Sequence, residues 1–397
     1  MADLHRQDEP EYFSVGHDDA QTELREHTIS SSDKEIACLF CGIGDARNLF
    51  ATIAYMSLNE ARNPSSKRFH FTILDIKPAV LARDLLMFRL LFDLSTQSKR
   101  KKRETLVTLS YIFGAQVMPK WAYDRLQTGL SAVLTDLKSY DGDMMGIFYI
   151  PLDVRTLISQ HVQAWKEVPE PWYNATRLRE LAHQQLLERQ MIEAGLTDGI
   201  DIKVPPGCED NGQDALYFKD LTAMLPHTDL LEKYEPRLLK LFTAYAGSGS
   251  ITTRRNVEEY LDSNWQPNVT VIDLDYENKR EARHMPLLDF QPHSIVQSLF
   301  GNIPVTYLNT HGVLNHFIGF FDFIATCMNK LQSKIVIEVI IGEMVDVCER
   351  LRHGILRQHQ EKLGNLEPST FPNAFDGIQM SNIPLVTPRS AQRILLM

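Results

Sequence analysis

Cysteine is scarce in this chain of 397 residues, which contains only five. Their odd number and scattered positions fit free thiols in a reducing compartment. Cys38 and Cys41 form a CxxC pair inside the apolar run IACLFCGIG, but no second pair of ligands stands at the spacing that a zinc site requires. We therefore interpret both as core residues and predict no metal site.

Long apolar runs are also lacking. No stretch of about 18 consecutive apolar residues is present, so the sequence predicts no transmembrane helix. The opening residues MADLHRQDEPEYF have neither the basic nor the apolar region of a secretory signal. We expect a cytoplasmic protein without a membrane partner, and the sequence leaves the oligomeric state open. An apolar fraction of 44% suffices for a sizeable core.

Charge is distributed unevenly along the chain. The net charge is −10, and residues 1–35 hold ten acidic but only three basic residues. Such a segment has little apolar surface to bury, so we predict an acidic, disordered tail over residues 1–34. Cations gather in one run, Lys99, Arg100, Lys101, Lys102 and Arg103. This run is either a solvated loop or a contact with nucleic-acid phosphates, and we expect it on the rim of the ligand-binding face.

The hydrophobic pattern of the first ordered part predicts alternating strands and helices. Residues 36–41 read as a strand buried on both faces, and apolar residues at helical spacing follow a glycine turn. A second strand over residues 68–75 ends in Asp75, and a helix over residues 79–94 follows. This order is typical of a right-handed βαβ unit in a parallel sheet.

The later sequence returns to strands after a long helical stretch. We predict strands over residues 269–275, 303–308 and 334–341 and a last one near residues 375–382. The predicted fold class is therefore α/β, a Rossmann-like, mostly parallel sheet built from both chain ends with a large helical insertion. The predicted parts are residues 35–100 and 266–397, which form the two halves of the sheet, and 101–265, which form the insertion.

The glycine turn is the sharpest candidate for a binding site. Glycines between a strand and a helix let a ligand approach the backbone, and the helix N-terminus offers free N–H groups. An acid at the end of the next strand accepts hydrogen bonds from ribose hydroxyls in many nucleoside-binding sheets. The dinucleotide motif is incomplete, because Arg47 stands where it needs glycine. The alternative is a structural turn with a capping acid. The predicted substrate-binding residues are Gly42, Gly44, Asp45, Arg47, Asn48, Asp75, Arg83 and Asp275.

A pair of acids follows the strand predicted over residues 334–341. Asp346 and Glu349 stand three residues apart, so on a helix they share one face. Together they could bind a guanidinium, or one of them could transfer a proton. We therefore predict Asp346 and Glu349 as the catalytic residues, with an ordinary helix surface as the alternative.

Two segments carry a resemblance to a known family. FCGIGDARNLFATIA and FTILDIKPAVLARDLLMFRLL resemble a domain-of-unknown-function family shared by fungal proteins and dynein axonemal assembly factors. VIEVIIGEMVDVCERLR and FDGIQMSNIP resemble the distal part of the fungal members. The match covers roughly residues 35–95 and 333–384. It departs from the family in lacking the cysteines of the MYND zinc finger and in having Leu385 where relatives carry an acid.

The chain is also similar to the arginine-containing cyclodipeptide synthases of fungal natural-product pathways. This resemblance implies a Rossmann-like fold related to class I aminoacyl-tRNA synthetases. It also implies an enzyme that joins two amino acids from aminoacyl-tRNAs, one of them arginyl-tRNA, into a diketopiperazine. No cofactor is implied, because the aminoacyl ester already stores the energy.

Three functions therefore stay open. In a cyclodipeptide synthase, the glycine turn and Asp75 would shape the aminoacyl-adenosine pocket, and residues 99–103 would bind tRNA phosphates. The first alternative is an S-adenosylmethionine-dependent methyltransferase, whose cofactor needs the same glycine turn and ribose acceptor. The second alternative is a non-catalytic assembly or scaffold protein that has kept the fold.

Overall fold

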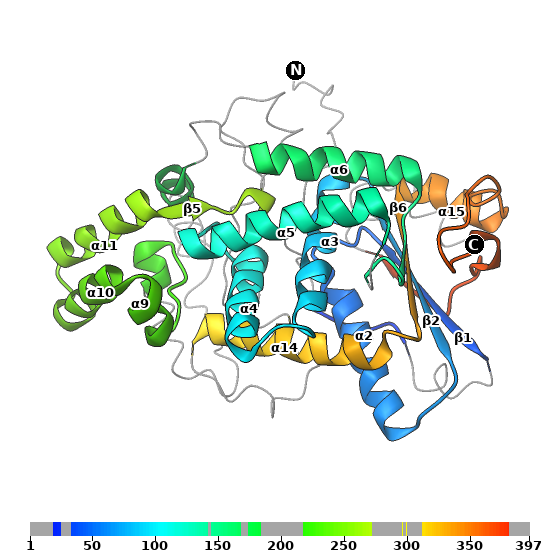
Figure 1. The fold of residues 1–397 in the computed structure, drawn as a ribbon, viewed down its shortest axis with the longest axis horizontal. Helices are drawn as coiled ribbons and strands as arrows, with labels where there is room; N and C mark the ends of the chain where they lie inside the picture. Colours follow the sequence, from blue (N-terminus) through cyan, green and yellow to red (C-terminus); the bar gives the residue numbers. More distant parts are fainter. Residues whose placement is uncertain are drawn as a thin grey trace, which may run out of the picture.

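A five-stranded parallel sheet forms the centre of the computed structural model, which describes residues 19–24, 33–141, 144–167, 174–183, 217–271, 296, 299 and 312–380. The strand order is β4-β6-β2-β1-β7, and every neighbouring pair is parallel (Figure 1). The strands are β1 (Glu35–Cys41), β2 (Arg68–Asp75), β4 (Phe148–Tyr149), β6 (Ile335–Ile341) and β7 (Gly377–Met380). The sheet confirms the predicted Rossmann-like α/β fold.

Helices lie on both faces of this sheet and also extend beyond it. They are α2 (Arg47–Arg62), α3 (Pro78–Asp93), α4 (Lys99–Gly114), α5 (Lys120–Ser139), α6 (Leu152–Glu167), α9 (Thr228–Tyr234), α10 (Pro236–Ser248), α11 (Ile251–Asn264), α14 (Val313–Leu331) and α15 (Met344–Arg352). A short antiparallel ribbon joins β3 (Val117–Pro119) to β5 (Trp265–Pro267). Figure 1 shows α9, α10 and α11 at the end of the molecule that lies far from the sheet. No helix in the described part of the chain combines the length and the apolar character needed to cross a bilayer.

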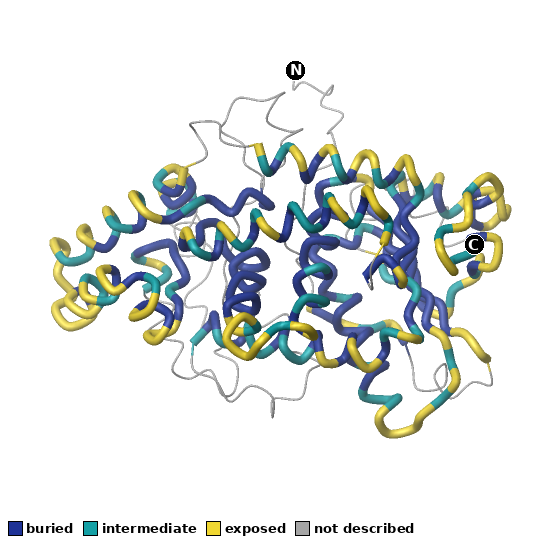
Figure 2. Tube along the Cα trace, in the orientation of Figure 1, coloured by how far each residue is buried: buried dark blue, intermediate teal, exposed yellow. Residues whose placement is uncertain are grey.

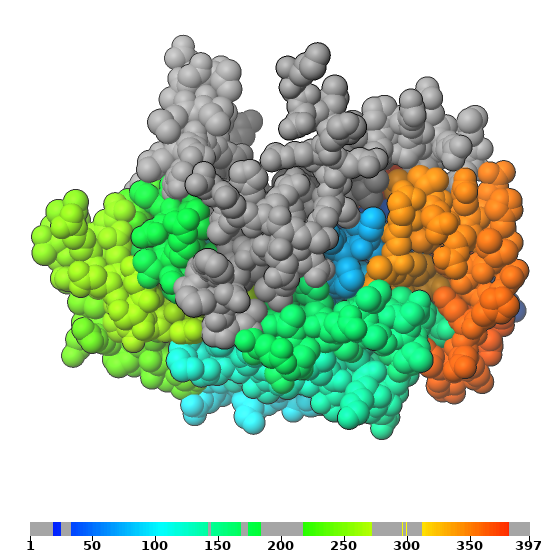
Figure 3. Space-filling view, turned by 90° about the horizontal axis from the view of Figure 1, so that it is seen from above, coloured from blue at the N-terminus to red at the C-terminus, as the bar shows by residue number. Residues whose placement is uncertain are grey.

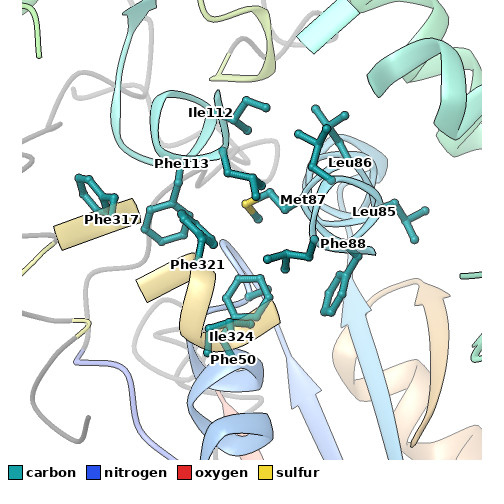
Figure 4. Close-up of a cluster of buried hydrophobic side chains, with 14 of the residues drawn as sticks. Phe50, Leu85, Leu86, Met87, Phe88, Ile112, Phe113, Phe317, Phe321 and Ile324 are labelled. Carbon is teal, nitrogen blue, oxygen red and sulfur yellow. The ribbon is translucent and has the colours of Figure 1, made fainter. Parts of the chain in front are cut away.

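The strand sequences are almost continuously apolar because both faces of the sheet are covered. Phe40 and Phe71 point to the larger core, whereas Leu39 and Leu74 point to a smaller core under α15. In the larger core, Phe50 of α2 lies 5.4 Å from Phe88 of α3, between ring centroids. Aromatic side chains of α4 and α14 complete this cluster (Figure 4). Figure 2 shows the buried residues concentrated on the strands and on the neighbouring helices α3 and α4.

Residues 101–265, predicted as a helical insertion, are mostly helical where the structure describes them, and they contribute to the main core and to the sheet. The first boundary of this range falls inside the first turn of α4, and α4 packs against α14 in the main core. Strand β4 also lies in this range, and it pairs with β6 at the edge of the main sheet. The chain folds this way because the apolar residues of α4 and α5 cover the same sheet face as α3.

The prediction that residues 1–34 form a disordered tail is wrong for residues 19–24. Ala20 and Leu24 are buried in the main core, at 1% and 5% exposure. The N–H of Gln21 donates to Oδ1 of Asn48, at 3.0 Å, at the start of α2. These few apolar and polar contacts anchor an acidic segment that by composition alone resembles a tail.

The C-terminal strands agree in part with the prediction. Strands β6 and β7 confirm the segments expected over residues 334–341 and 375–382. Val269–Val271 forms a 3₁₀ turn instead of the start of a strand. The remainder of the segment expected over 269–275, and all of 303–308, lie outside the described residues.

Candidate functional site at the carboxyl edge of the sheet

The connections that leave neighbouring strands diverge at one place on the carboxyl edge. After β2 the chain enters α3, whose side chains belong to the larger core, whereas after β6 it enters α15 on the opposite face. The two exits touch each other, because the N–H of Gly342 donates to the carbonyl of Asp75, at 3.1 Å. Ligands of open parallel sheets bind where strand connections diverge in this way. In Figure 3, a small blue surface from the N-terminal part of the chain borders the orange surface of the segment that follows β6.

The turn between β1 and α2 is left-handed at three positions. Gly42, Gly44 and Ala46 have φ angles of 67°, 62° and 58°. Its N–H groups are largely engaged within the protein. Those of Gly42 and Ile43 donate to the carbonyl of Leu74, and that of Gly44 donates to the carboxylate of Asp75. These three donors are thus occupied, in contrast to the free N–H groups expected of a phosphate cradle.

An ion pair closes the turn at the start of α2. The Nε of Arg47 donates to Oδ1 of Asp45 at 2.9 Å, and its terminal nitrogen lies 2.6 Å from Oδ2. Both residues are buried, at 1% and 3% exposure. A carboxylate therefore already occupies the helix N-terminus, where a phosphate would otherwise bind. Asp45, Arg47 and Asn48 come together as predicted, but their polar groups bind partners within the chain.

Asp75 ends β2 beside the turn, as the sequence predicts. Its carboxylate accepts hydrogen bonds from the N–H groups of Lys77, at 2.9 Å, and of Gly44 and Ile76. Burial raises the pKa of Asp75 to about 6, although these N–H groups and the Lys77 cation counteract that rise. The geometry is that of an acid that holds two turns together, and three of the roughly four acceptor positions of its carboxylate are already used.

Asp84 is the residue that the sequence analysis missed. It lies on α3 with no exposed surface, and neither of its carboxylate oxygens has a hydrogen-bond partner among the described residues. Burial raises the pKa of Asp84 well above its usual value; Arg83 opposes this rise, and Asp45 and Asp75 add to it. The available signal in the sequence is a charged residue inside the apolar helix AVLARDLLMF.

Arg83, predicted to bind substrate, contacts the end of a neighbouring helix. Its guanidinium donates to the carbonyls of Ile112 and Phe113, at 2.8 and 3.0 Å, at the C-terminal end of α4. The side-chain amide of Asn268 donates to the neighbouring carbonyls of Tyr111 and Ala115. Because the last carbonyls of a helix lack partners within it, these two buried side chains stabilise the end of α4.

Asp346 and Glu349, predicted as the catalytic residues, lie together on α15. Both lie on the exposed face of α15, and the side chain of Asp346 is 64% exposed and pairs with Arg350 at 3.7 Å. The i, i+3 spacing placed them correctly on one helix face, but that face is turned to solvent. Asp275, the last predicted substrate-binding residue, lies outside the described residues.

The basic run is the start of helix α4, not a loop. Lys102 pairs with Asp322 of α14 at 2.7 Å, and Arg103 forms an ion pair with Asp229 of α9. Lys99, Arg100 and Lys101 are exposed, with Arg100 3.5 Å from Glu104 of its own helix. Part of the run therefore fastens α4 to its neighbours, and three cations face solvent.

The basic run also lies far from the glycine turn. Helix α3 starts at the carboxyl edge after β2, and its 16 residues extend for about 24 Å. Arg89, near the end of α3, pairs with Asp136 in the last turn of α5. The chain goes on from α5 to the start of β4, so the end of α3 lies toward the amino edge of the sheet. The start of α4 follows on that opposite side, beside α14 (Figure 1). The prediction of a basic rim around the ligand edge is therefore wrong.

A second buried polar cluster lies on the sheet face that α15 covers, and no local pattern in the sequence predicts it. Arg357 binds both oxygens of Glu338 on β6, at 2.7 and 2.6 Å, and Thr72 donates to one of them. His70 lies 3.4 Å from the same carboxylate. Burial alone would raise the pKa of Glu338, but Arg357 and His70 lower it to about 2. Among the described residues, no three His, Cys, Asp or Glu side chains are placed to hold a metal.

Replacement of Gly44 by valine tests the turn. A Cβ at this position meets nothing closer than the carbonyl oxygen of Gly42, at 4.0 Å, so the cost comes from the backbone angle of 62°. We expect a loss of about 1–3 kcal/mol in unfolding free energy by urea titration, together with loss of activity. Gly249→Val is the matched control, because its φ is 59° in an open turn between α10 and α11. Equal activity in the two variants would place the site elsewhere.

Comparison with known proteins gives one family match. No curated protein and no solved structure matches the chain. Residues 14–118 match the model of a domain of unknown function, DUF4470. The matched range includes the anchored segment 19–24, the glycine turn, Asp75, Asp84 and the basic start of α4. About a quarter of this protein, near its N-terminus, is therefore similar to an uncharacterised domain family. The matched range contains the glycine turn and the acids around it.

Proposed function

We propose that this protein is an enzyme that joins arginine, delivered as arginyl-tRNA, to a second amino acid in a cyclic dipeptide. The observation that carries the proposal is Asp84, a fully buried carboxyl group near Asp45 and Asp75 that has no hydrogen-bond partner in the described part of the chain. An unpartnered buried carboxyl is costly, and a ligand that brings a cation removes the cost. A guanidinium or an amino acid ammonium supplies such a cation.

The charges around the turn favour a cation over a phosphate. The Asp45 carboxylate occupies the start of α2, and the N–H of Gly44 is bound to Asp75. Arg47 is already paired with Asp45, at 2.6 Å. An incoming phosphate would therefore meet carboxylates, whereas a guanidinium would meet a bidentate acceptor in Asp84. Because Asp84 has no exposed surface, the turn has to move aside when the ligand enters.

The proposed reaction needs no further energy source. The amine of one aminoacyl group attacks the ester carbon of the other, an amide bond forms, and the ester bond to the ribose breaks. The amine loses a proton and the departing ribose oxygen gains one. A second attack of the same kind closes the ring. Asp84 would bind the arginine side chain during these steps. Asp346 and Glu349 have no part in this scheme, because both are exposed on α15.

Expression in a bacterial host, followed by mass spectrometry of the medium, tests the proposal. We expect a new cyclic dipeptide that contains arginine, and we expect the purified protein to form it from arginyl-tRNA. Gly249→Val should retain the product and Gly44→Val should lose it. If wild-type protein and charged tRNA give no cyclic dipeptide, the proposed function is wrong.

The exposed cations of α4 should contact tRNA phosphates. Each phosphate contact contributes roughly 0.7–0.9 to the slope of log affinity against log salt. Replacement of Lys99, Arg100 and Lys101 by glutamine should therefore weaken tRNA binding and flatten that slope by about 2 units. The matched control replaces Lys102 and Arg103, whose charges are engaged by Asp322 and Asp229. It should lower stability slightly and leave the slope unchanged. Equal slopes in both variants would contradict a phosphate contact at this surface.

A methyltransferase is the second candidate, and the position of Asp75 favours it. An acid at the end of β2, beside a glycine turn after β1, is where a ribose acceptor is expected. S-adenosylmethionine also carries a sulfonium and an ammonium, so it meets the same requirement for a cation. Calorimetric titration distinguishes the two candidate functions, because a cyclodipeptide synthase should not bind S-adenosylmethionine at about 100 μM. Tight binding would favour the methyltransferase.

A further inference from the structure

Two cysteines far apart in the sequence meet behind the glycine turn. Cys41 is the last residue of β1, immediately before Gly42, and it is 1% exposed. Cys348 lies on α15 and is half-buried against the same small core. Their thiols are hydrogen-bonded to each other. They connect the strand that leads into the turn with the helix that follows β6.

The close approach of α15 depends on the residue that precedes it. A Cβ on Gly342 would lie 2.7 Å from Cγ2 of Val347, so only glycine lets the helix pack this near to the end of β6. The Glu343 side chain then accepts the N–H of Asp346 and fixes the first turn of α15. Met344, Val347 and Leu351 bury their side chains against the sheet, which positions Cys348 beside Cys41.

We propose that Cys41 and Cys348 are an oxidation site, at which a peroxide forms a disulfide that ties the glycine turn to α15. The Cys348 thiolate attacks one peroxide oxygen and becomes a sulfenic acid, while the other oxygen leaves as water after taking up a proton. The Cys41 sulfur then displaces the sulfenic hydroxyl, which leaves as a second water. Two thiols lose two electrons and two protons in total, and one peroxide is reduced to two waters.

The two thiols have different roles because their surroundings differ. Cys348 is partly accessible, and the hydrogen bond from Cys41 lowers its pKa, although burial opposes this. Cys41 donates that hydrogen bond from a buried position, and both effects raise its pKa. Cys348 is therefore the sulfur that meets the oxidant, and Cys41 is the one that resolves the sulfenic acid. Bond formation shortens a non-bonded sulfur contact to about 2.05 Å, which pulls the end of β1 toward α15.

The experiment uses the wild-type chain treated with a small excess of hydrogen peroxide. Thiols are then alkylated under denaturing conditions and the peptides are mapped by mass spectrometry. We expect the number of free thiols to fall by two, a cross-linked peptide pair that contains Cys41 and Cys348, and full reversal by dithiothreitol. A bridge between Cys348 and Cys208, or a wild-type Cys348 that becomes sulfinic acid without a bridge, would overturn the proposal.

Variants separate the two roles. In Cys41→Ala, Cys348 has no resolving partner, so it should gain two oxygens and become a sulfinic acid. In Cys348→Ser, Cys41 should stay reduced at the same peroxide concentration. Cys327→Ser is the matched control, because that buried thiol lies on α14, away from the pair, and its loss should leave the bridge intact. Oxidation of Cys41 in Cys348→Ser would contradict the assignment of the attacking thiol.

Discussion

Arg357→Ala should lower the free energy of unfolding at pH 7 by about 3–5 kcal/mol, measured by urea titration. The guanidinium contacts both oxygens of Glu338 and also donates to the carbonyls of Phe371 and Pro372. Its loss leaves a carboxylate at 1% exposure, with Thr72 as a hydrogen-bond donor and His70 at 3.4 Å. It also removes one of the contacts that hold the segment between α15 and β7 against the sheet, where Tyr149 and His70 still pack on Phe371.

Acid should reduce the difference between the wild type and this variant. The pKa of Glu338 is lowered to about 2 in the folded protein, against an ordinary value of 4.5. Its contribution to stability is therefore present above about pH 4.5 and is lost as the pH falls toward 2. The double variant Glu338→Gln/Arg357→Ala should be more stable than Arg357→Ala at pH 7, because no unpaired charge is left. A loss below about 1 kcal/mol in Arg357→Ala would contradict the role of this ion pair.

Asp84→Asn should increase the free energy of unfolding, in contrast to Arg357→Ala. It should also abolish the proposed formation of the cyclic dipeptide. Removal of an unpartnered buried carboxyl group relieves a desolvation cost of about 1–3 kcal/mol. Because the folded-state pKa of Asp84 is raised, its stabilising contribution is present at acid pH and is lost as the pH rises. The gain in the variant should therefore be absent near pH 4 and grow toward pH 8.

The matched control for this prediction is Asp346→Asn, which changes an exposed acid on α15. It should leave both stability and the yield of cyclic dipeptide unchanged. A less stable Asp84→Asn protein would show that Asp84 has a partner in the folded chain. A more stable variant that still forms the arginine-containing product would show that the carboxylate is not the arginine acceptor. The two outcomes are distinguished by measuring unfolding and product formation on the same preparation.

Local sequence was sufficient for the elements of the fold. The apolar runs that became β1, β2 and β6 and the glycine turn before α2 were predicted within a few residues, because burial on both faces and left-handed backbone leave strong local patterns. The position of Asp75 at the carboxyl edge followed from the same reasoning, since each strand of a βαβ unit ends at the same edge.

Only the tertiary structure decided what each charged residue contacts. Arg83 and Asp84 are neighbours in sequence, yet one stabilises the end of α4 and the other is buried with no hydrogen-bond partner in the part of the chain that the structure describes. Lys102 and Lys101 are likewise adjacent, and only the first reaches a carboxylate on α14. The spacing of residues in the sequence does not indicate which residue a charged side chain contacts. That contact depends on how helices pack, and it joins residues tens to hundreds of positions apart. The sequence by itself therefore determined the sheet and its turn, whereas packing determined which acids and cations remain available to a ligand.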